Sequence, residues 1–152
     1  MRSVERRLER LVDGAVGRFF RGGVRPVEIG HRLVREMADS RSVGVKGQSV
    51  VANHFEVRLH ETDLARFADV EESLVRELCE AAREAARDDG WNFMGPVQVV
   101  LTESADVRPG QLRIDARMKE ADGATGVLHL SNGQQVVLGE YLKNKRHAAL
   151  TR

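Results

Sequence analysis

A metal ion would be bound by histidine, cysteine or carboxylate side chains, and this 152-residue chain has five histidines, one cysteine and 23 carboxylates. A metal site needs several such ligands at one point, but the histidines are spread along the chain: His31, His54, His60, His129 and His147. A strand rises ~3.3 Å per residue, so His54 and His60 would lie roughly 20 Å apart on one strand, too far for one ion. We therefore expect no metal and no cofactor, and we interpret the histidines as surface or partner-contacting residues.

No catalytic motif stands out. Cys79, the only cysteine, lies on the apolar stripe of a predicted helix, which is typical of a buried structural thiol. Gly44-Val-Lys-Gly-Gln-Ser49 has the composition of a phosphate loop but lacks its Gly-Lys-Ser/Thr order. Neither a Gly-x-Ser-x-Gly elbow nor a Gly-x-Gly-x-x-Gly fingerprint occurs. We therefore expect a protein that is not an enzyme.

The basic residues are candidates for a partner surface. Residues 1–35 contain nine Arg and four acids, whereas residues 61–90 contain four Arg and ten acids. Arg2, Arg6 and Arg10 are spaced by four, so they would form a stripe for an acidic partner, RNA or a membrane surface. Alternatively, the two segments lie close together and neutralise each other as solvated faces. The net charge of +1 does not by itself predict nucleic-acid binding.

Two helices are predicted at the start of the chain. Apolar residues at intervals of three and four predict a helix over residues 3–20. A second helix begins at Pro26, where the missing N–H costs nothing, and a polar loop over 40–47 follows it. The inner face of the second helix is formed by Gly30, Leu33, Val34 and Met37.

A strand and a long helix come next. Alternating apolar and polar residues over 50–59 predict a strand with one face in the core, and a short helix over 61–67 follows. Asp69 and Glu72 predict a capping box at the start of a long helix, which Gly90 ends. The buried stripe of that helix is Val70, Leu74, Val75, Leu78, Cys79, Ala82, Ala85 and Ala86.

Two further alternating runs predict strands over 97–101 and 112–118. Residues 104–110, which contain Pro109-Gly110, predict a hairpin-type connection between them. The long helix favours a crossover that leaves the first and second strands parallel. The predicted fold class is therefore α+β in the order ααβαββ, with a three-stranded mixed sheet covered by helices on one face.

The other face of this sheet would be polar. Its residues would be His54, Glu56, Arg58, Gln98, Val100, Thr102, Arg113, Asp115 and Arg117. Solvent is the commonest neighbour of such a face, and a docked partner is the alternative. The candidate partner surface is thus Arg2, Arg6, Arg10, Arg58, Arg113 and Arg117.

The composition changes after residue 118. Residues 1–118 are predicted to form the α+β domain and residues 119–126 a polar linker. Residues 127–152 begin with a predicted β-hairpin that has Asn-Gly at its turn.

The segment from Arg25 to Phe67 resembles the N-terminal domain that precedes forkhead-associated (FHA) phosphopeptide-binding modules in actinobacterial signalling proteins. The resemblance covers roughly Val4 to Arg117 and rests on the order and spacing of the Pro26 helix, the Gly-containing loop, Val50–Leu59 and Glu61–Phe67. It implies a non-enzymatic adaptor near Ser/Thr kinase signalling, which in such bacteria touches cell-wall synthesis and division. The implied partners are proteins, either Ser/Thr kinase substrates or cell-wall proteins.

The alternative hypothesis is a KH-like nucleic-acid-binding module. Gly44-Val-Lys-Gly47 has the spacing of the Gly-x-x-Gly clamp of such modules, and the first predicted helix is basic. Aromatic residues suited to base stacking are few, so we do not expect nucleic-acid binding. The chain starts without an apolar signal core and contains no run of about 20 apolar residues, so a cytoplasmic location is expected.

The C-terminal hairpin resembles the opening of an FHA module. The segment Leu142–Leu150 resembles the FHA phosphate-holding segment, with Asn144 where a Ser would stand and His147 at the structural His. No Gly-Arg pair follows Leu138-Gly-Glu140. The resemblance therefore implies a truncated or degenerate phosphothreonine motif, and we expect no specific phosphothreonine binding.

Overall fold

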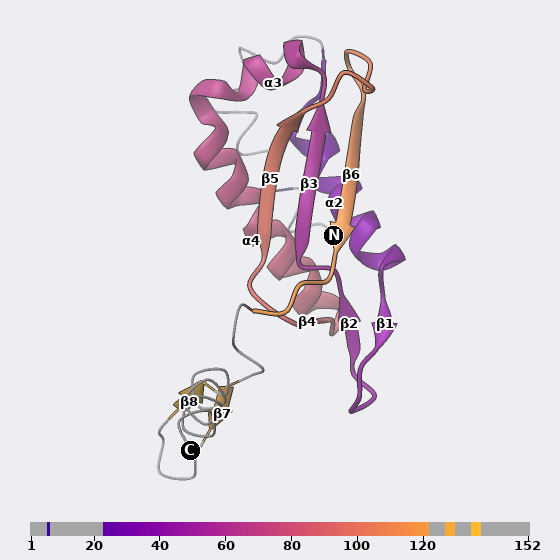
Figure 1. The fold of residues 1–152 in the computed structure, drawn as a ribbon, viewed down its shortest axis with the longest axis vertical. Coiled ribbons are helices and arrows are strands. Elements are labelled where there is room, and N and C mark those ends of the chain that lie inside the picture. Colours follow the sequence, from indigo (N-terminus) through magenta and orange to yellow (C-terminus); the bar gives the residue numbers. More distant parts are fainter. Residues whose placement is uncertain (1–5, 7–22, 122–126, 130–134, 138–152) are drawn as a thin grey trace, which may run out of the picture. The chain divides into compact units, whose positions relative to one another are not determined.

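The computed structural model describes residue 6, residues 23–121 and two strand segments, 127–129 and 135–137 (Figure 1). The chain divides into two compact units, Met1–Met118 and Lys119–Arg152, and each is considered by itself. Of the helix predicted over 3–20, only Arg6 is described, as helical and exposed. Arg2 and Arg10 lie outside the described residues.

A three-stranded mixed sheet forms the centre of the first unit (Figure 1). The central strand β3 (His54–Leu59) pairs in parallel with β5 (Gln98–Glu103) and antiparallel with β6 (Leu112–Arg117). Helices α2 (Pro26–Asp39) and α4 (Glu71–Asp89) lie behind this sheet and cover one of its faces. The predicted α+β class and the predicted parallel crossover through the long helix are both confirmed.

The connection between β5 and β6 is not the hairpin that we predicted. The two strands lie on opposite sides of β3, so residues 104–110 cross the end of β3 instead of joining neighbours. Ser104 N donates to Leu59 O at 2.8 Å, which ties the start of this crossing to the end of β3. The physical reason is that the α4 crossover places β5 at one edge of β3 and leaves the other edge free for β6.

A second, smaller sheet was not predicted. It contains β1 (Ser42–Val43), β2 (Ser49–Val51) and β4 (Asn92–Phe93) in that spatial order. The single strand expected over 50–59 is divided at Asn53, which is 1% exposed and donates from Nδ2 to Pro96 O at 3.1 Å. The buried amide therefore separates two strands that belong to different sheets.

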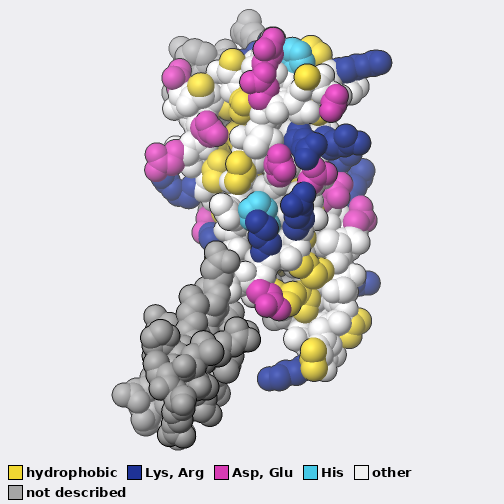
Figure 2. All heavy atoms as spheres, viewed as in Figure 1, with side chains coloured by type: hydrophobic (Ala, Val, Ile, Leu, Met, Phe, Trp, Pro, Cys, Tyr) yellow, Lys and Arg dark blue, Asp and Glu magenta, His cyan; other side chains and the backbone are white. Residues whose placement is uncertain are grey.

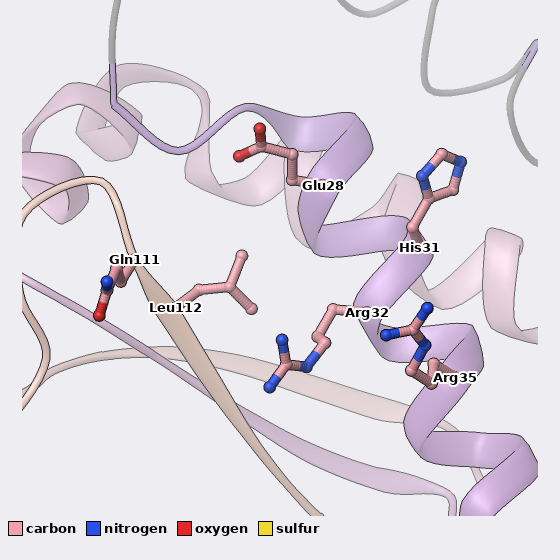
Figure 3. Close-up of a pocket in the computed structure, with 6 residues that line it drawn as sticks. All are labelled: Glu28, His31, Arg32, Arg35, Gln111 and Leu112. Carbon is pink, nitrogen blue, oxygen red and sulfur yellow. The ribbon is translucent and has the colours of Figure 1, made fainter.

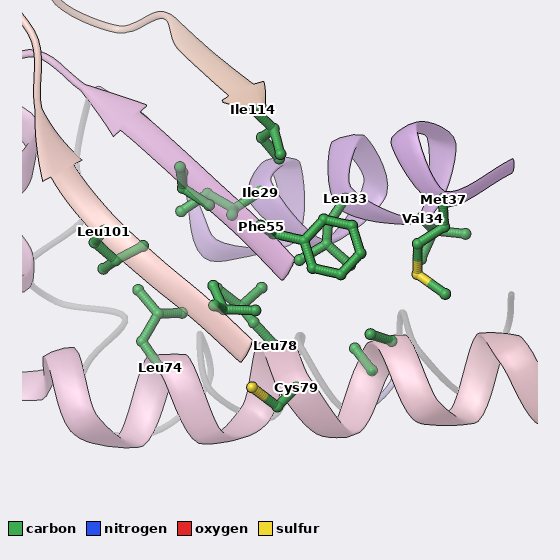
Figure 4. Close-up of a cluster of buried hydrophobic side chains, with 14 of the residues drawn as sticks. Ile29, Leu33, Val34, Met37, Phe55, Leu74, Leu78, Cys79, Leu101 and Ile114 are labelled. Carbon is green, nitrogen blue, oxygen red and sulfur yellow. The ribbon is translucent and has the colours of Figure 1, made fainter. Parts of the chain in front are cut away.

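The core lies between the main sheet and helices α2 and α4 (Figure 4). Leu33, Phe55 and Leu78 are fully buried there, and each such side chain contributes about 1.5–3 kcal/mol of hydrophobic free energy. The predicted inner face of α2 is confirmed. The stripe of α4 is confirmed except that Val70 and Val75 are only partly buried, and it also includes Ala81.

The predicted capping box of α4 is wrong. Helix α3 (Glu61–Phe67) continues through a 3-10 turn, η1 (Ala68–Val70), directly into α4, and no side chain caps the new helix. Asp69 lies inside this turn, whereas a capping residue needs an extended backbone. The end of α4 is as predicted, because Gly90 is left-handed (φ 68°) and Trp91 N donates to Ala86 O at 2.8 Å.

The described strands of the second unit are two, and they pair with each other. Strand β7 (Val127–His129) pairs antiparallel with β8 (Gln135–Val137), as predicted from the sequence. Its Asn-Gly turn, Asn144 and His147 lie outside the described residues.

Candidate protein-interaction surface

The face of the main sheet that is not covered by any helix of residues 23–121 is named here the open sheet face. Three rows of side chains cross β5, β3 and β6 on it, and all nine were predicted to share one face. The rows are Gln98, His54 and Arg117; Val100, Glu56 and Asp115; and Thr102, Arg58 and Arg113. Figure 2 shows basic and acidic side chains intermixed across this face. The registers therefore confirm the predicted polar face.

Arg58, on the central strand of this face, is held by two carboxylates. Its Nη2 lies 2.9 Å from Asp115 Oδ2, and its Nε lies 3.6 Å from Glu56 Oε1. Thr102 donates from Oγ1 to the same Glu56 oxygen at 3.1 Å. Half-exposed ion pairs of this kind contribute little to stability, but together they hold the guanidinium in place.

Arg113 and Arg117 are exposed and lie on the same strand. Arg113 stands directly opposite Arg58 across β3 and β6, and like charges at such positions repel. In the described part of the chain no ion pair joins Arg113 or Arg117 to another residue. Both cations are therefore available to carboxylates of another molecule.

Two shallow hollows run between α2 and the outer edge of β6. The first, of about 570 Å³, has a basic wall formed by His31, Arg32 and Arg35. Figure 3 shows Glu28 and Arg32 directed toward Gln111 and Leu112 of the sheet edge. The first hollow is lined mainly by charged side chains, which does not suit an apolar small-molecule ligand.

The second hollow, of about 470 Å³, lies further along the same edge and has an acidic wall. Glu36 and Asp39 of α2 form this wall, and Asp115 and the cationic Arg117 of β6 also line the hollow. Arg32 Nε lies 3.6 Å from Glu36 Oε1, so one ion pair joins the two walls. The α2–β6 edge is therefore basic at one end and acidic at the other.

Exposed apolar residues gather at the small sheet, and this group is named here the apolar tip. Its members are Val43 (78% exposed), Val45 (105%), Met94 (45%) and Met118 (37%). Figure 2 shows hydrophobic side chains at the end of the unit where Figure 1 places β1 and β2. Sequence reasoning missed this group, although two valines in a loop expected to be polar were a signal.

The Gly-x-x-Gly segment is the turn of the β1–β2 hairpin. Gly44 N donates to Gln48 O at 2.7 Å, and Gly47 N donates to Gly44 O at 3.0 Å. Lys46 N donates to Gln48 Oε1 at 2.9 Å. These amides are used within the turn, so they do not form a ready clamp for a nucleic-acid backbone.

Two residues considered in the sequence analysis, His60 and Cys79, have structural roles in the fold. His60 caps α3, since its Nδ1 accepts from Thr62 N at 3.2 Å. Cys79 is buried, as predicted, and burial raises the pKa of its thiol despite the opposing charge of Arg83.

Across the described ranges, no group of three His, Cys, Asp or Glu could hold a metal ion. None of the helices in that part of the chain has the length and apolar composition to span a bilayer.

Asp63 is a buried carboxylate that sequence reasoning did not single out. It is 2% exposed, and its two oxygens accept from Val24 N at 3.3 Å and from Gly110 N at 2.7 Å. Arg66 Nη1 lies 3.9 Å from Oδ1. Asp63 therefore joins the segment before α2 to the β5–β6 connection, which is a structural role.

Comparison with known proteins defines the class to which this fold belongs. The family model "FhaA, N-terminal domain" matches residues 1–115. The chain therefore belongs to the FhaA N-terminal domain family, and the resemblance to FHA-protein N-terminal domains is confirmed.

Two particular relatives accompany this family match. The "FHA domain-containing protein FhaA" of Mycobacterium tuberculosis (strain H37Rv) is 29% identical over 111 residues, which are 72% of this chain and 21% of that protein. The chain thus corresponds to about a fifth of the length of this curated relative. The solved "Rv0020c_Nter structure" matches with a TM-score of 0.59 and 24% identity, over 67% of this chain and 77% of that one. This second likeness shows the shared fold.

Proposed function

We propose that this chain is a non-enzymatic adaptor domain of an FHA-containing protein, acting in Ser/Thr kinase signalling linked to cell-wall synthesis or division. Membership of the FhaA N-terminal domain family is the observation that carries the proposal. The relative is named for an FHA domain, and the matched region is only a fifth of that protein. A domain attached to a phosphopeptide-binding module is well placed to bring a second protein to it. The proposed location is cytoplasmic.

The domain boundaries are part of the same proposal. Residues 1–118 would be the adaptor domain, residues 119–126 a linker, and residues 127–152 the start or remnant of an FHA module.

The apolar tip and the open sheet face together offer the chemistry of a protein interface. Arg117 belongs to the open sheet face, and Met118, the next residue, belongs to the apolar tip. Protein interfaces combine a desolvated apolar centre with a polar rim. A partner segment with apolar residues followed by carboxylates would fit the tip and then Arg117.

Site-specific photo-crosslinking tests the proposed surface. A crosslinking amino acid would replace Val45 on the apolar tip or Val100 on the open sheet face, in the intact FHA-containing protein expressed in a mycobacterial host. The matched control replaces Arg76 on the outer side of α4, where the side chain is 64% exposed. We expect the first two positions to capture the same protein, a kinase substrate or a cell-wall protein, and the control to capture none. Equal capture from all three positions would contradict the proposed surface.

Titration with short single-stranded RNA at two salt concentrations tests the KH-like alternative. Binding to phosphates weakens steeply as salt rises, because counterions are released. We expect no saturable binding at low salt. Saturable, salt-sensitive binding would favour the nucleic-acid module. Turnover of a nucleotide or ester in proportion to the purified chain would contradict the non-enzymatic assignment.

A further inference from the structure

The outer edge of β6 is an unused pairing edge in the described part of the main sheet. The spatial order β5-β3-β6 places no strand beyond β6. In any strand, alternate residues direct their N–H and C=O groups to the same side, so half of the residues of β6 direct theirs away from β3. Such an edge is a template for another strand, and charged side chains usually protect it from pairing.

The charges on β6 favour one particular antiparallel pairing with a second copy of this chain. If Ile114 stands opposite Ile114 of the second copy, Arg113 stands opposite Asp115 of the second copy. The two-fold symmetry repeats this contact, so both cross-strand pairs are attractive. A shift by two residues would place Arg113 opposite Arg113 or Asp115 opposite Asp115. A shift by one residue would turn the polar face of one copy toward the helix-covered face of the other.

The same pairing relieves a repulsion within each copy. Arg113 stands opposite Arg58, while Asp115 already lies 2.9 Å from Arg58. A carboxylate from the second copy would therefore give Arg113 the partner that its own sheet does not supply. On the helix-covered face Ile114 is 6% exposed, so pairing there would extend the apolar core across the two-fold axis.

The two hollows beside β6 are complementary under this symmetry. Helix α2 runs in the same direction as β6, with Arg32 and Arg35 near Leu112 and with Glu36 and Asp39 near Arg117. Antiparallel pairing reverses the second copy. The basic wall of each copy would then lie along the edge that carries the acidic wall of the other.

We propose that this domain self-associates through β6, forming a two-fold dimer whose six-stranded sheet is centred on Ile114. The inference does not rest on the proposed adaptor role, because it is argued from the outer edge of β6, although Arg113 and Asp115 also belong to the open sheet face. The dimer would form without a change of backbone conformation, because the pairing edge of each copy, β6, is already a strand.

Charge exchange between copies tests the dimer. Each of the two variants, Arg113→Asp and Asp115→Arg, places like charges opposite each other at both symmetric contacts. We expect sedimentation equilibrium over a concentration series to show dimers of the unaltered chain. In either variant alone the dimer should be about tenfold weaker or more. An equimolar mixture of the two variants should recover dimers, because the carboxylate introduced at position 113 of one copy would face the guanidinium introduced at position 115 of the other.

A charge change away from β6 provides the control. Arg76→Asp on the outer side of α4 should dimerise like the unaltered chain. A chain that stays monomeric at every concentration overturns the proposal. So do folded variants that dimerise normally, or a mixture of folded variants without recovery.

Amide hydrogen exchange provides a measurement that needs no variant. Alternate amides of residues 112–117 should gain protection as the concentration of the unaltered chain rises. Protection that does not depend on concentration would count against pairing through β6.

Discussion

At the scale of single residues, Asp63 is a buried side chain that joins two segments far apart in sequence. Its carboxylate accepts two backbone N–H groups from segments far apart in sequence, Val24 and Gly110. Buried donors of this kind need a partner, because an unsatisfied buried group costs about 1–3 kcal/mol. A single side chain thus holds the entry to α2 against the β5–β6 connection.

Asp63→Asn should lower the free energy of unfolding by about 1–3 kcal/mol, since an amide can offer only one acceptor oxygen to two N–H donors. Urea denaturation followed by circular dichroism measures the change. Asp69→Asn is the matched control, because Asp69 is exposed in the η1 turn and caps no helix. A comparable loss in Asp69→Asn would show that the effect is not specific to the buried carboxylate of Asp63.

Cys79 gives a prediction about pH. Burial raises the pKa of its thiol above the ordinary value of 9.0, so the folded chain retains this proton at a pH where the unfolded chain loses it. The unfolded state is then favoured, and stability that is present below pH 9.0 is lost as the pH rises through this range. Cys79→Ala should remove this part of the loss. The difference in free energy of unfolding between the unaltered chain and Cys79→Ala should therefore shrink above pH 9.0. A difference that stays constant with pH would contradict the raised pKa of this thiol.

At the scale of the elements, α4 contributes the most extended apolar stripe to the core. Leu74 and Leu78 lie on its inner side, whereas Arg76 is 64% exposed on its outer side. A carboxylate introduced among apolar side chains without a partner costs several kcal/mol. The whole domain is stabilised by only ~5–15 kcal/mol.

Leu78→Asp or Leu74→Asp should therefore abolish cooperative unfolding of the domain. Arg76→Glu and Arg6→Glu should melt close to the unaltered chain, because both side chains are exposed. A thermal melt followed at the helical circular dichroism signal measures all four variants. The reverse ranking would show that the inner and outer faces are assigned wrongly.

At the scale of the whole molecule, the chain consists of two units that the structure describes to different extents. The first is an α+β domain with its own core, and the second is described only for residues 119–121 and the β7–β8 pair of strands. The assignment of residues 127–152 to the start or a remnant of an FHA module is our proposal, and binding of a phosphopeptide tests it.

We predict that this chain does not bind phosphothreonine specifically. No Gly-Arg pair follows Leu138-Gly-Glu140, and Asn144 stands where a Ser would hold the phosphate. Isothermal titration with a phosphothreonine peptide and its unphosphorylated twin compares the two affinities. A micromolar preference for the phosphorylated peptide, lost in His147→Ala, would show that the motif is functional.

The sequence by itself determined the features that depend on local periodicity. Apolar spacing identified α2, α3 and α4, and the alternation over 112–117 identified β6. Gly90 marked the end of α4 because a left-handed residue strongly favours glycine. The alternation also placed Arg58, Arg113 and Arg117 on one sheet face.

Only the tertiary structure decided which segments pair and which polar groups are buried. The order β5-β3-β6, the division at Asn53 and the role of Asp63 each depend on partners far away in sequence. The free energy of such pairings comes from long-range contacts that local patterns do not encode. For the same reason the apolar tip and the bipolar α2–β6 edge became visible only when distant segments were brought together.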